Sequence, residues 1–248
     1  MNMGQRVALV TGASRGIGRA ISQRLAADGM RIVGVARTAE LLDETLGMCA
    51  SSSMPHEKFA ADLTDKDGLQ SLLEWLQVRA IYPNIVVNNL GGSLAKEAWV
   101  STDEWKEVWM LNVGIAHSLN LALVPRMREQ RWGRLVHVST LSARTFNGYP
   151  PYVAAKCALE GYVKAMARTV SADGIVISAV APGAIRVDGK YLARLAEEDP
   201  VALGLWLARE SKAVRLGEPD EVATAVSFLC SDDASYMSGA IIEVDGGG

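Results

Sequence analysis

The chain has 248 residues, 49% of them hydrophobic, and a formal net charge of −3. This length suits a single α/β domain that buries a sizeable core. The charge balance shows no excess of basic groups for nucleic acid or for an anionic membrane surface, so we expect neither as a partner.

The cysteines and the amino-terminal sequence indicate the compartment. Cys49, Cys157 and Cys230 have neither metal-ligand spacing nor a CxxC motif, which predicts reduced thiols and no metal site. The amino terminus lacks the long apolar segment of a signal peptide, and no apolar run approaches the length of a membrane span. We therefore expect a cytoplasmic protein.

A glycine-rich turn follows the first predicted strand. Residues 7–10 form a short apolar run typical of a strand buried on both faces, and residues 11–18 read TGASRGIG before a helical pattern that ends at Gly29. Glycines let a ligand approach the backbone, and free N–H groups at a helix start attract a pyrophosphate. The alternative is an ordinary tight turn, because the spacing TGxxxGxG differs from the common GxGxxG.

The end of the second predicted strand, residues 31–36, indicates which dinucleotide binds. An NAD site usually has an acid here to hold the ribose 2′-hydroxyl, whereas this chain has Arg37, which suits a 2′-phosphate. Arg15 in the glycine turn is a second cation that could reach the same group. Each arginine alone could equally be a solvated surface residue. Together they predict NADP (NADPH) as the cofactor, with NAD less favoured.

Strands and helices alternate along the whole chain. After the second strand the pattern predicts a helix at 39–50, a strand at 58–63, a helix through 69–76, a strand from 85, a helix at 102–130, a strand at 134–138, a helix from 152 to about 171, a strand at 175–180, two short helices within 188–212, a helix at 219–229 and a strand at 240–244. This alternation predicts one domain over residues 1–248, with a Rossmann-type doubly wound parallel β-sheet and helices on both faces. Ligands of such sheets bind at the carboxyl ends of the strands.

Tyr152 and Lys156 form a candidate proton-donating pair. They lie four residues apart at the start of a predicted helix, after Pro150 and Pro151, so both side chains share one helix face. A cation beside a phenol favours the phenolate and lowers the tyrosine pKa. Taken alone the spacing also arises by chance on amphipathic helices.

In combination these residues resemble the short-chain dehydrogenase/reductase family over essentially the whole chain. The segments that carry the resemblance are the turn 11–18, Asp62-Leu63, the loop Asn88-Asn89-Leu90-Gly91, Asn112, Ser139 with Tyr152-x-x-x-Lys156, Pro182-Gly183, residues 215–223, and Gly239 followed by Asp245-Gly246-Gly247. No single motif is decisive, but their order and spacing agree with the family throughout.

The resemblance implies a role for each matching residue. Tyr152 would give a proton to the carbonyl oxygen of the substrate as the nicotinamide delivers hydride to the carbon, and Ser139 would hydrogen-bond that oxygen. Lys156 would hold the nicotinamide ribose and lower the pKa of the tyrosine. Asn112 would anchor a water molecule of the proton relay. The implied cofactor-binding residues are Gly12, Ser14, Arg15, Gly16, Ile17, Gly18, Arg37, Asp62, Leu63, Asn89, Gly91, Tyr152, Lys156, Pro182, Gly183 and Ile185.

The chain departs from the family pattern at three positions. At the first position, two ways of aligning the chain select different hydroxyl donors. Counting thirteen residues back from Tyr152 selects Ser139, whereas counting along the strand from Gly133 selects Thr140. We predict Ser139, because the spacing to the tyrosine is the safer guide. Val187 stands where the family usually has a threonine that contacts the nicotinamide amide. Leu90 replaces the usual alanine of the Asn-Asn-Ala-Gly loop.

These features predict an NADP-dependent enzyme that interconverts a ketone and a secondary alcohol. One possible substrate is a small ketone, sugar or polyol, and the other is a 3-oxoacyl thioester on acyl carrier protein. Arg131 matches a basic residue by which reductases of the second kind bind the acidic carrier. Asp173 stands where those reductases have a second basic residue, and an acid there argues against the carrier. Residues 188–212 would form a lid over the substrate. The alternative class is a non-catalytic dinucleotide-binding regulator.

The resemblance also implies a homo-oligomer, either a tetramer or a dimer. The helices that contain Asn112 and Tyr152 would pack against a partner subunit. Their richness in apolar residues is consistent with this, although burial within one chain produces the same pattern.

Overall fold

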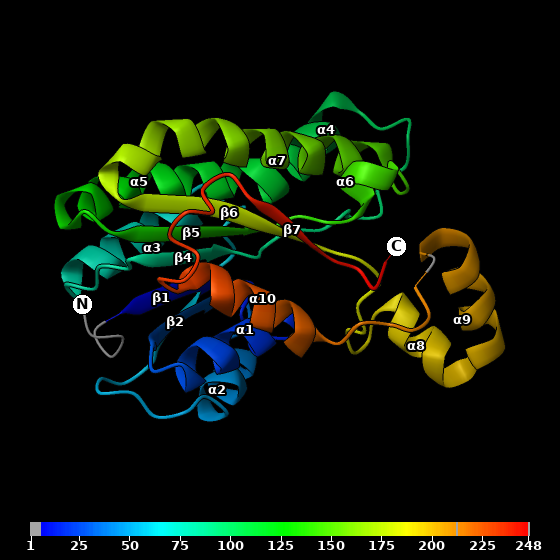
Figure 1. The fold of residues 1–248 in the computed structure, drawn as a ribbon, viewed down its shortest axis with the longest axis horizontal. Helices are drawn as coiled ribbons and strands as arrows, with labels where there is room; N and C mark the ends of the chain where they lie inside the picture. The colour runs from blue at the N-terminus through cyan, green and yellow to red at the C-terminus, as the bar shows by residue number, and fades with distance from the viewer. Residues whose placement is uncertain (1–5, 212, 248) are drawn as a thin grey trace.

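The computed structural model describes residues 6–211 and 213–247 and contains a seven-stranded sheet (Figure 1). The strand order is β3-β2-β1-β4-β5-β6-β7, and all neighbouring strands are parallel. The strands are β1 (Val7–Thr11), β2 (Arg31–Ala36), β3 (Glu57–Ala60), β4 (Ile85–Asn88), β5 (Gly133–Val138), β6 (Ile175–Pro182) and β7 (Ile241–Val244). The order reverses between β1 and β4, so the predicted doubly wound Rossmann-type sheet is confirmed.

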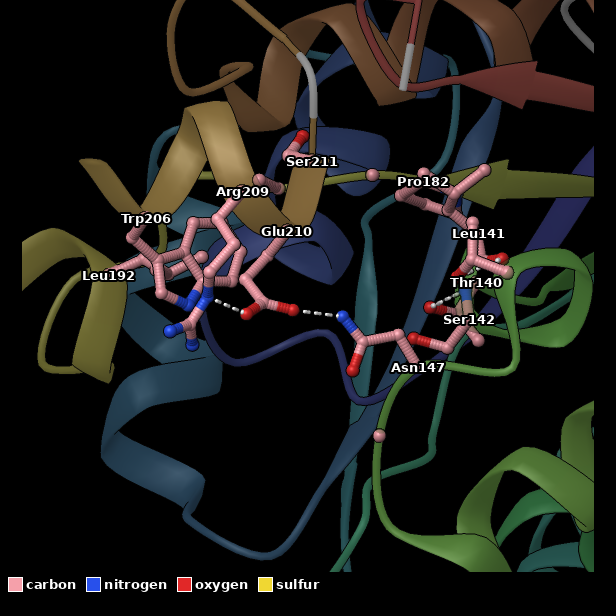
Figure 2. A pocket seen from close by; sticks show the side chains of 14 residues that line it. Thr140, Leu141, Ser142, Asn147, Pro182, Leu192, Trp206, Arg209, Glu210 and Ser211 are labelled. Atoms are coloured by element: carbon pink, nitrogen blue, oxygen red, sulfur yellow. Dashed lines mark hydrogen bonds and ion pairs between the residues drawn. The ribbon is translucent and has the colours of Figure 1, made fainter. Parts of the chain in front are cut away.

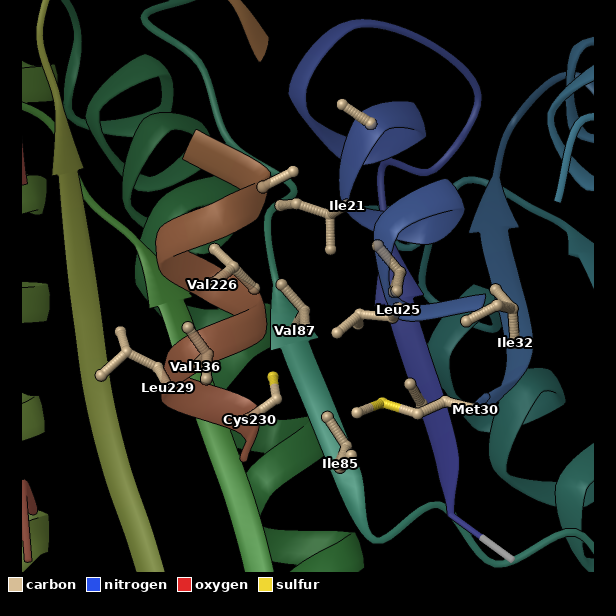
Figure 3. Packing of buried hydrophobic residues seen from close by; sticks show 14 of the residues in the cluster. Ile21, Leu25, Met30, Ile32, Ile85, Val87, Val136, Val226, Leu229 and Cys230 are labelled. Atoms are coloured by element: carbon tan, nitrogen blue, oxygen red, sulfur yellow. The ribbon is translucent and has the colours of Figure 1, made fainter. Parts of the chain in front are cut away.

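Helices cover both faces of the sheet. The helices α1 (Gly16–Ala27), α2 (Ala39–Gly47) and α10 (Pro219–Cys230) pack on one face, and α3 (Gly68–Val78), α5 (Ile115–Gln130) and α7 (Pro150–Val170) pack on the other. In Figure 3, Ile21 and Leu25 of α1 and Val226 of α10 surround Val87 of β4, whereas Leu229 of α10 lies beside Val136 of β5, and all six are fully buried. Each such side chain contributes about 1.5–3 kcal/mol on burial, so these apolar faces hold the helices on the sheet.

The third strand is shorter than predicted. It ends at Ala60, whereas the sequence suggested a strand over residues 58–63. The carboxylate of Asp62 accepts hydrogen bonds from the amide and the hydroxyl of Thr64 at 2.9 and 2.6 Å, which turns the chain. Local side-chain bonding of this kind competes with strand pairing. Asp62 consequently lies in a turn just beyond the carboxyl end of β3.

A π-helical turn interrupts the predicted helix 102–130. The first part is α4 (Thr102–Trp109), which begins at a capping box formed by Ser101 and Glu104. The turn η2 (Met110–Gly114) then separates α4 from α5. Asn112 lies inside this turn and is 2% exposed. Single π-helical turns occur frequently at functional sites.

The helix α7 begins earlier than predicted, and two short helical segments were not predicted. α7 starts at Pro150, with both prolines in its first turn, two residues before Tyr152. The short segments α6 (Ser142–Thr145) and η3 (Ser171–Asp173) have only four and three residues, too few for a hydrophobic period to be visible in the sequence.

The segment after β6 contains the two predicted short helices. They are α8 (Tyr191–Glu198) and α9 (Pro200–Trp206), followed by a π-helical turn η4 (Leu207–Ser211). Lys212, the last residue of the predicted lid, lies outside the described residues. Leu207 packs with Ala184 and Leu216 in a small apolar cluster of its own. Figure 1 shows α8 and α9 beside the carboxyl ends of the strands, apart from the helical layers.

One helical stretch of the described residues passes a test for membrane spans by length and composition alone. This stretch is Thr102–Gln130, and half of its apolar window is buried inside the protein. The stretch is not a continuous apolar run, because Asn112, His117 and Asn120 interrupt it. Ile115 and Leu119 pack in the apolar cluster between the helices and the sheet, as the residues of a core helix do.

The glycine turn can be tested by adding a single methyl group. A Cβ at Gly18 would lie 2.1 Å from the backbone oxygen of Gly12, whereas a Cβ at Gly161 on α7 meets nothing within 4 Å. Gly18→Ala should lower the free energy of unfolding by about 1–3 kcal/mol, because the backbone must move. Gly161→Ala is the matched control and should raise it by up to about 1 kcal/mol. Urea denaturation measures both, and equal effects of the two changes would contradict the tight turn.

Candidate active site

A large cleft of about 1300 Å³ lies at the carboxyl ends of the strands. It is lined by every residue that the sequence assigned to cofactor binding, from six separate segments of the chain. These residues are Gly12, Ser14, Arg15, Gly16, Ile17, Gly18, Arg37, Asp62, Leu63, Asn89, Gly91, Tyr152, Lys156, Pro182, Gly183 and Ile185. Ser139 and Thr140 also line the cleft, whereas Asn112 does not.

The glycine turn is fastened to the loop that follows β4. The side-chain amide of Asn89 donates to the backbone oxygens of Thr11 and Gly12 at 2.9 and 3.3 Å. In return, the hydroxyl of Thr11 accepts hydrogen bonds from the amides of Asn89 and Leu90 at 3.1 and 3.0 Å. A Cβ at Gly18 would lie 2.6 Å from the Asn89 amide nitrogen. The turn therefore has no room for a side chain at this glycine.

The start of α1 presents an anion-binding end to the cleft. Its first residue, Gly16, has φ of +55°, a conformation that favours glycine. The first turn carries no acidic residue, and the N-cap Arg15 makes no side-chain capping bond. The first N–H groups of a helix lack partners within the helix and point along a dipole that attracts negative charge. This end of α1 can therefore bind phosphate.

Arg37 lies at the far end of the same cleft, next to Asp62. Its side chain is 72% exposed, and a guanidinium nitrogen lies 3.5 Å from a carboxylate oxygen of Asp62. Burial would raise the pKa of Asp62, but the hydrogen bonds from Thr64 and the charge of Arg37 outweigh it and lower the pKa. The guanidinium of Arg37 is thus accessible to an anionic ligand bound in the cleft.

Lys156 is almost completely buried beside Tyr152. The lysine is 3% exposed, and its ammonium donates to the backbone oxygen of Val138 at 2.7 Å. The ammonium nitrogen lies 5.8 Å from the centre of the Tyr152 ring. Burial lowers the pKa of Lys156 to about 8, although the negative charge of Glu160 acts in the opposite direction. The predicted pair is therefore brought together in the cleft.

The pKa of Tyr152 moves in the direction opposite to the sequence expectation. Burial raises it, and a hydrogen bond with the side chain of Thr140 offsets only part of this rise. The expected lowering by Lys156 does not dominate, because removing the phenol from water disfavours the phenolate more strongly. Tyr152 is therefore protonated at neutral pH, which is the state a proton donor requires.

Thr140 and Ser139 have different hydrogen-bond partners. Thr140 hydrogen-bonds Tyr152, whereas the hydroxyl of Ser139 donates to a carboxylate oxygen of Glu160 at 2.8 Å. The same oxygen accepts a bond from Arg144 at 2.9 Å. This geometry favours Thr140, which counting along the strand also selects, as the hydroxyl donor. The choice of Ser139 stays a prediction.

The side chain of Asn112 holds the loop that follows β4, although it does not itself line the cleft. Its amide nitrogen donates to the backbone oxygens of Gly92 and Val108, and its side-chain oxygen accepts from the amide of Gly92 at 3.0 Å. A Cβ at Gly91 would lie 2.8 Å from the Asn112 oxygen and 3.0 Å from the Lys156 nitrogen. Asn112 therefore fixes the loop after β4 directly against the lysine.

Val187 and Leu90, two residues that depart from the family pattern, both pack against neighbouring parts of the structure. A Cβ at Gly16 would lie 2.7 Å from a methyl group of Val187, so this valine packs against the glycine turn. Leu90 packs against the apolar cluster between the sheet and the α3/α5/α7 layer. Both side chains line the cleft.

A second cavity of about 440 Å³ adjoins the cleft beneath α9 and η4 (Figure 2). Thr140, Pro182, Gly183 and Leu192 line both spaces, so the two are adjacent. Sequence reasoning missed this cavity, because its walls come from three segments that are distant in the chain. It missed Glu160 for the same reason.

The doubly wound sheet, the glycine turn and the buried tyrosine–lysine pair define a class of dinucleotide-dependent oxidoreductases. A family model described as enoyl-(acyl carrier protein) reductase matches residues 12–248. The chain belongs to the short-chain dehydrogenase/reductase family.

Among its relatives, the 3-oxoacyl-[acyl-carrier-protein] reductase FabG of Pseudomonas aeruginosa is 34% identical over 251 residues, which cover 100% of this chain and 98% of that protein. FabG of Escherichia coli K12 is also 34% identical, over 252 residues and with the same coverage. Among solved structures, the L-sorbose reductase of Gluconobacter frateurii, complexed with NADPH and L-sorbose, has a TM-score of 0.88 and 30% identity and covers 100% of this chain and 98% of its own.

The burial of Lys156 predicts a dependence of stability on pH. Its pKa in the folded protein, about 8, lies below the usual lysine value of 10.5. Between these two values the unfolded chain holds a proton that the folded protein has lost, so folding becomes more favourable as pH rises. The difference in free energy of unfolding between the wild type and Lys156→Met should be constant below pH 7. From pH 8 to 10.5 this difference should increase in favour of the wild type.

Chemical denaturation across this pH range measures the difference, since other titrating groups cancel between the two proteins. Lys164→Met, on the exposed face of the same helix, is the control and should run parallel to the wild type. A parallel profile for Lys156→Met as well would show that the lysine is not desolvated.

Proposed function

We propose that this protein is an NADPH-dependent carbonyl reductase, which reduces a ketone to a secondary alcohol and catalyses the reverse oxidation when supplied with the alcohol. The observation that carries the proposal is the group of Tyr152, Thr140 and the buried Lys156 at the cleft wall. The relatives support it, since FabG is a 3-oxoacyl reductase by name and the similar L-sorbose reductase was solved with NADPH.

The cleft residues fit a phosphorylated dinucleotide. Gly18 lets the glycine turn pack closely on itself and on Asn89, and α1 begins without an acidic residue in its first turn. Arg37 and Arg15 would hold the 2′-phosphate, and Lys156 the nicotinamide ribose. The nicotinamide supplies the hydride, for which no amino-acid side chain is suited.

The protein residues supply the proton and the electrostatic stabilisation. Tyr152 donates its proton to the carbonyl oxygen, and its raised pKa keeps that proton in place at neutral pH. Thr140 hydrogen-bonds the same oxygen as negative charge develops on it. Lys156, with a pKa of about 8, is mainly charged at pH 7 and stabilises the phenolate that proton transfer leaves. Asn112 holds the neighbouring loop and would anchor a water that returns the proton.

A small ketone is favoured over a ketone carried on acyl carrier protein. An acidic carrier needs unpaired basic groups on its partner. Here Asp173 lies 2.7 Å from a guanidinium nitrogen of Arg128 and 3.8 Å from one of Arg131. This carboxylate neutralises part of the positive charge on which a carrier would dock.

We further propose a cytoplasmic homo-oligomer, a tetramer or a dimer. The free cysteines Cys49, Cys157 and Cys230 suit a reducing compartment. Large apolar side chains lie exposed along α4, η2 and α5, namely Trp105, Trp109, Met110 and Leu121. Exposed large apolar side chains on these helices suit packing against a second subunit.

Removal of the phenol tests the chemistry. Tyr152→Phe deletes the proton donor and leaves the ring, so turnover should fall by about 100-fold or more while NADPH affinity stays within a few-fold. Oxidation of NADPH with a panel of ketones measures turnover, and fluorescence titration measures affinity. A variant that keeps more than about a tenth of the wild-type rate would show that Tyr152 is not the acid.

The two neighbouring hydroxyls are separated by a pair of substitutions. Thr140→Val removes the group that bonds Tyr152 and should lower kcat by about 100-fold, the usual cost of one oxyanion donor. Ser139→Ala removes a partner of Glu160 and should mainly lower the melting temperature. Steady-state kinetics and thermal denaturation of both variants distinguish the roles, and a larger loss of kcat in Ser139→Ala would return the assignment to Ser139.

Cofactor preference depends on the cations at the adenine end. A guanidinium–phosphate contact contributes about 1.5–3 kcal/mol, so Arg37 with Arg15 should favour NADPH over NADH by roughly 100-fold in kcat/KM. Arg37→Asp should abolish this preference, because it adds repulsion to lost attraction. Equal kcat/KM for both cofactors in the wild type would refute NADP specificity and the reductive direction inferred from it.

A further inference from the structure

We infer that the cavity beneath α9 and η4 is a subsite for the hydroxyl groups of a small polyhydroxylated ketone, with Glu210 as the residue that selects such substrates. The inference rests on the proposed function and names the substrate class for it. Figure 2 shows Glu210 on the lid side of the cavity, with Thr140 and Pro182 on the opposite side.

The position of the cavity connects it to the reacting centre. Thr140, which hydrogen-bonds Tyr152, lines both the cavity and the main cleft. A ketone whose carbonyl oxygen lies beside Tyr152 and Thr140 would therefore extend the rest of its chain under the lid. The volume of about 440 Å³ suits a small molecule.

The walls of the cavity are rich in hydrogen-bonding groups. Ser142, Thr145 and Asn147 come from the segment before α7, and Glu210 and Ser211 come from the lid. The hydroxyl of Ser211 is buried, and among the described residues it has no hydrogen-bond partner. A buried hydroxyl without a partner carries a free-energy cost that a polar ligand can remove. An acyl chain would leave the hydroxyl of Ser211 unsatisfied.

Glu210 supplies a hydrogen-bond acceptor at this wall. Its side chain is 21% exposed, and its two oxygens contact the amide of Asn147 and the guanidinium of Arg209 (Figure 2). A carboxylate only accepts hydrogen bonds, so it recognises hydroxyl groups. Arg209 also lines the cavity, and its pairing with Glu210 leaves no net charge on the two side chains. The wall therefore favours a neutral substrate with several hydroxyls over an acid or a phosphorylated thioester.

Matched pairs of ketones test the inference. The kcat/KM for erythrulose and fructose, measured with NADPH, should exceed that for 2-butanone and 2-hexanone by about tenfold or more, because the hydroxyls pair with buried polar groups. Glu210→Gln should lower this ratio by about tenfold, and Ser211→Ala should lower it by a smaller factor. Glu198→Gln is the control, since Glu198 is an exposed lid carboxylate outside the cavity, and it should leave the ratio unchanged.

The outcomes separate the inference from the function on which it rests. A wild-type preference for the deoxy ketones would overturn the subsite while leaving carbonyl reduction intact. An unchanged ratio in Glu210→Gln, with both rates lowered together, would also overturn it and assign Glu210 to holding the lid on Asn147. Failure to reduce any of the four ketones would overturn both proposals.

Discussion

The amide of Asn89 joins the two loops on which the whole site depends. By bonding the backbone oxygens of Thr11 and Gly12, it fixes the end of β1 against the end of β4 at the point where the strand order reverses. The same loop continues to Gly91 and Gly92, which Asn112 holds against Lys156. The phosphate-binding end and the reactive end of the cleft are thus positioned by one continuous set of backbone contacts.

A buried acid organises the reactive end from the opposite side. Glu160 lies one helical turn after Lys156, and its side chain is 12% exposed. A carboxylate in such a place is costly unless it is hydrogen-bonded, and Ser139 and Arg144 provide those bonds. Its negative charge opposes the effect of burial on the lysine pKa. Ser139 therefore contributes to the site through Glu160, which leaves Thr140 free to face the tyrosine.

The parts of the molecule that the sequence could predict are those encoded by local pattern. Apolar runs and helical periods gave the sheet and its layers, and the glycine turn and the Tyr152–Lys156 spacing gave the cleft. Local pattern cannot decide between Ser139 and Thr140, because successive residues of an extended chain face opposite sides, so a shift of one residue reverses the assignment. The π-helical turn at Asn112 and the cavity under the lid depend on contacts between distant segments, which no local pattern records.

The pairing of α1 with α10 also constrains how the chain is made. The apolar face of α1, with Ile21 and Leu25, packs toward Val226 of α10 (Figure 3). Ribosomes add about 5–20 residues per second, and α10 leaves the ribosome some two hundred residues after α1. For at least about ten seconds, the nascent chain must carry an uncovered apolar helix. The nucleotide-binding half of this fold cannot mature during translation, and its completion awaits the last helix to emerge.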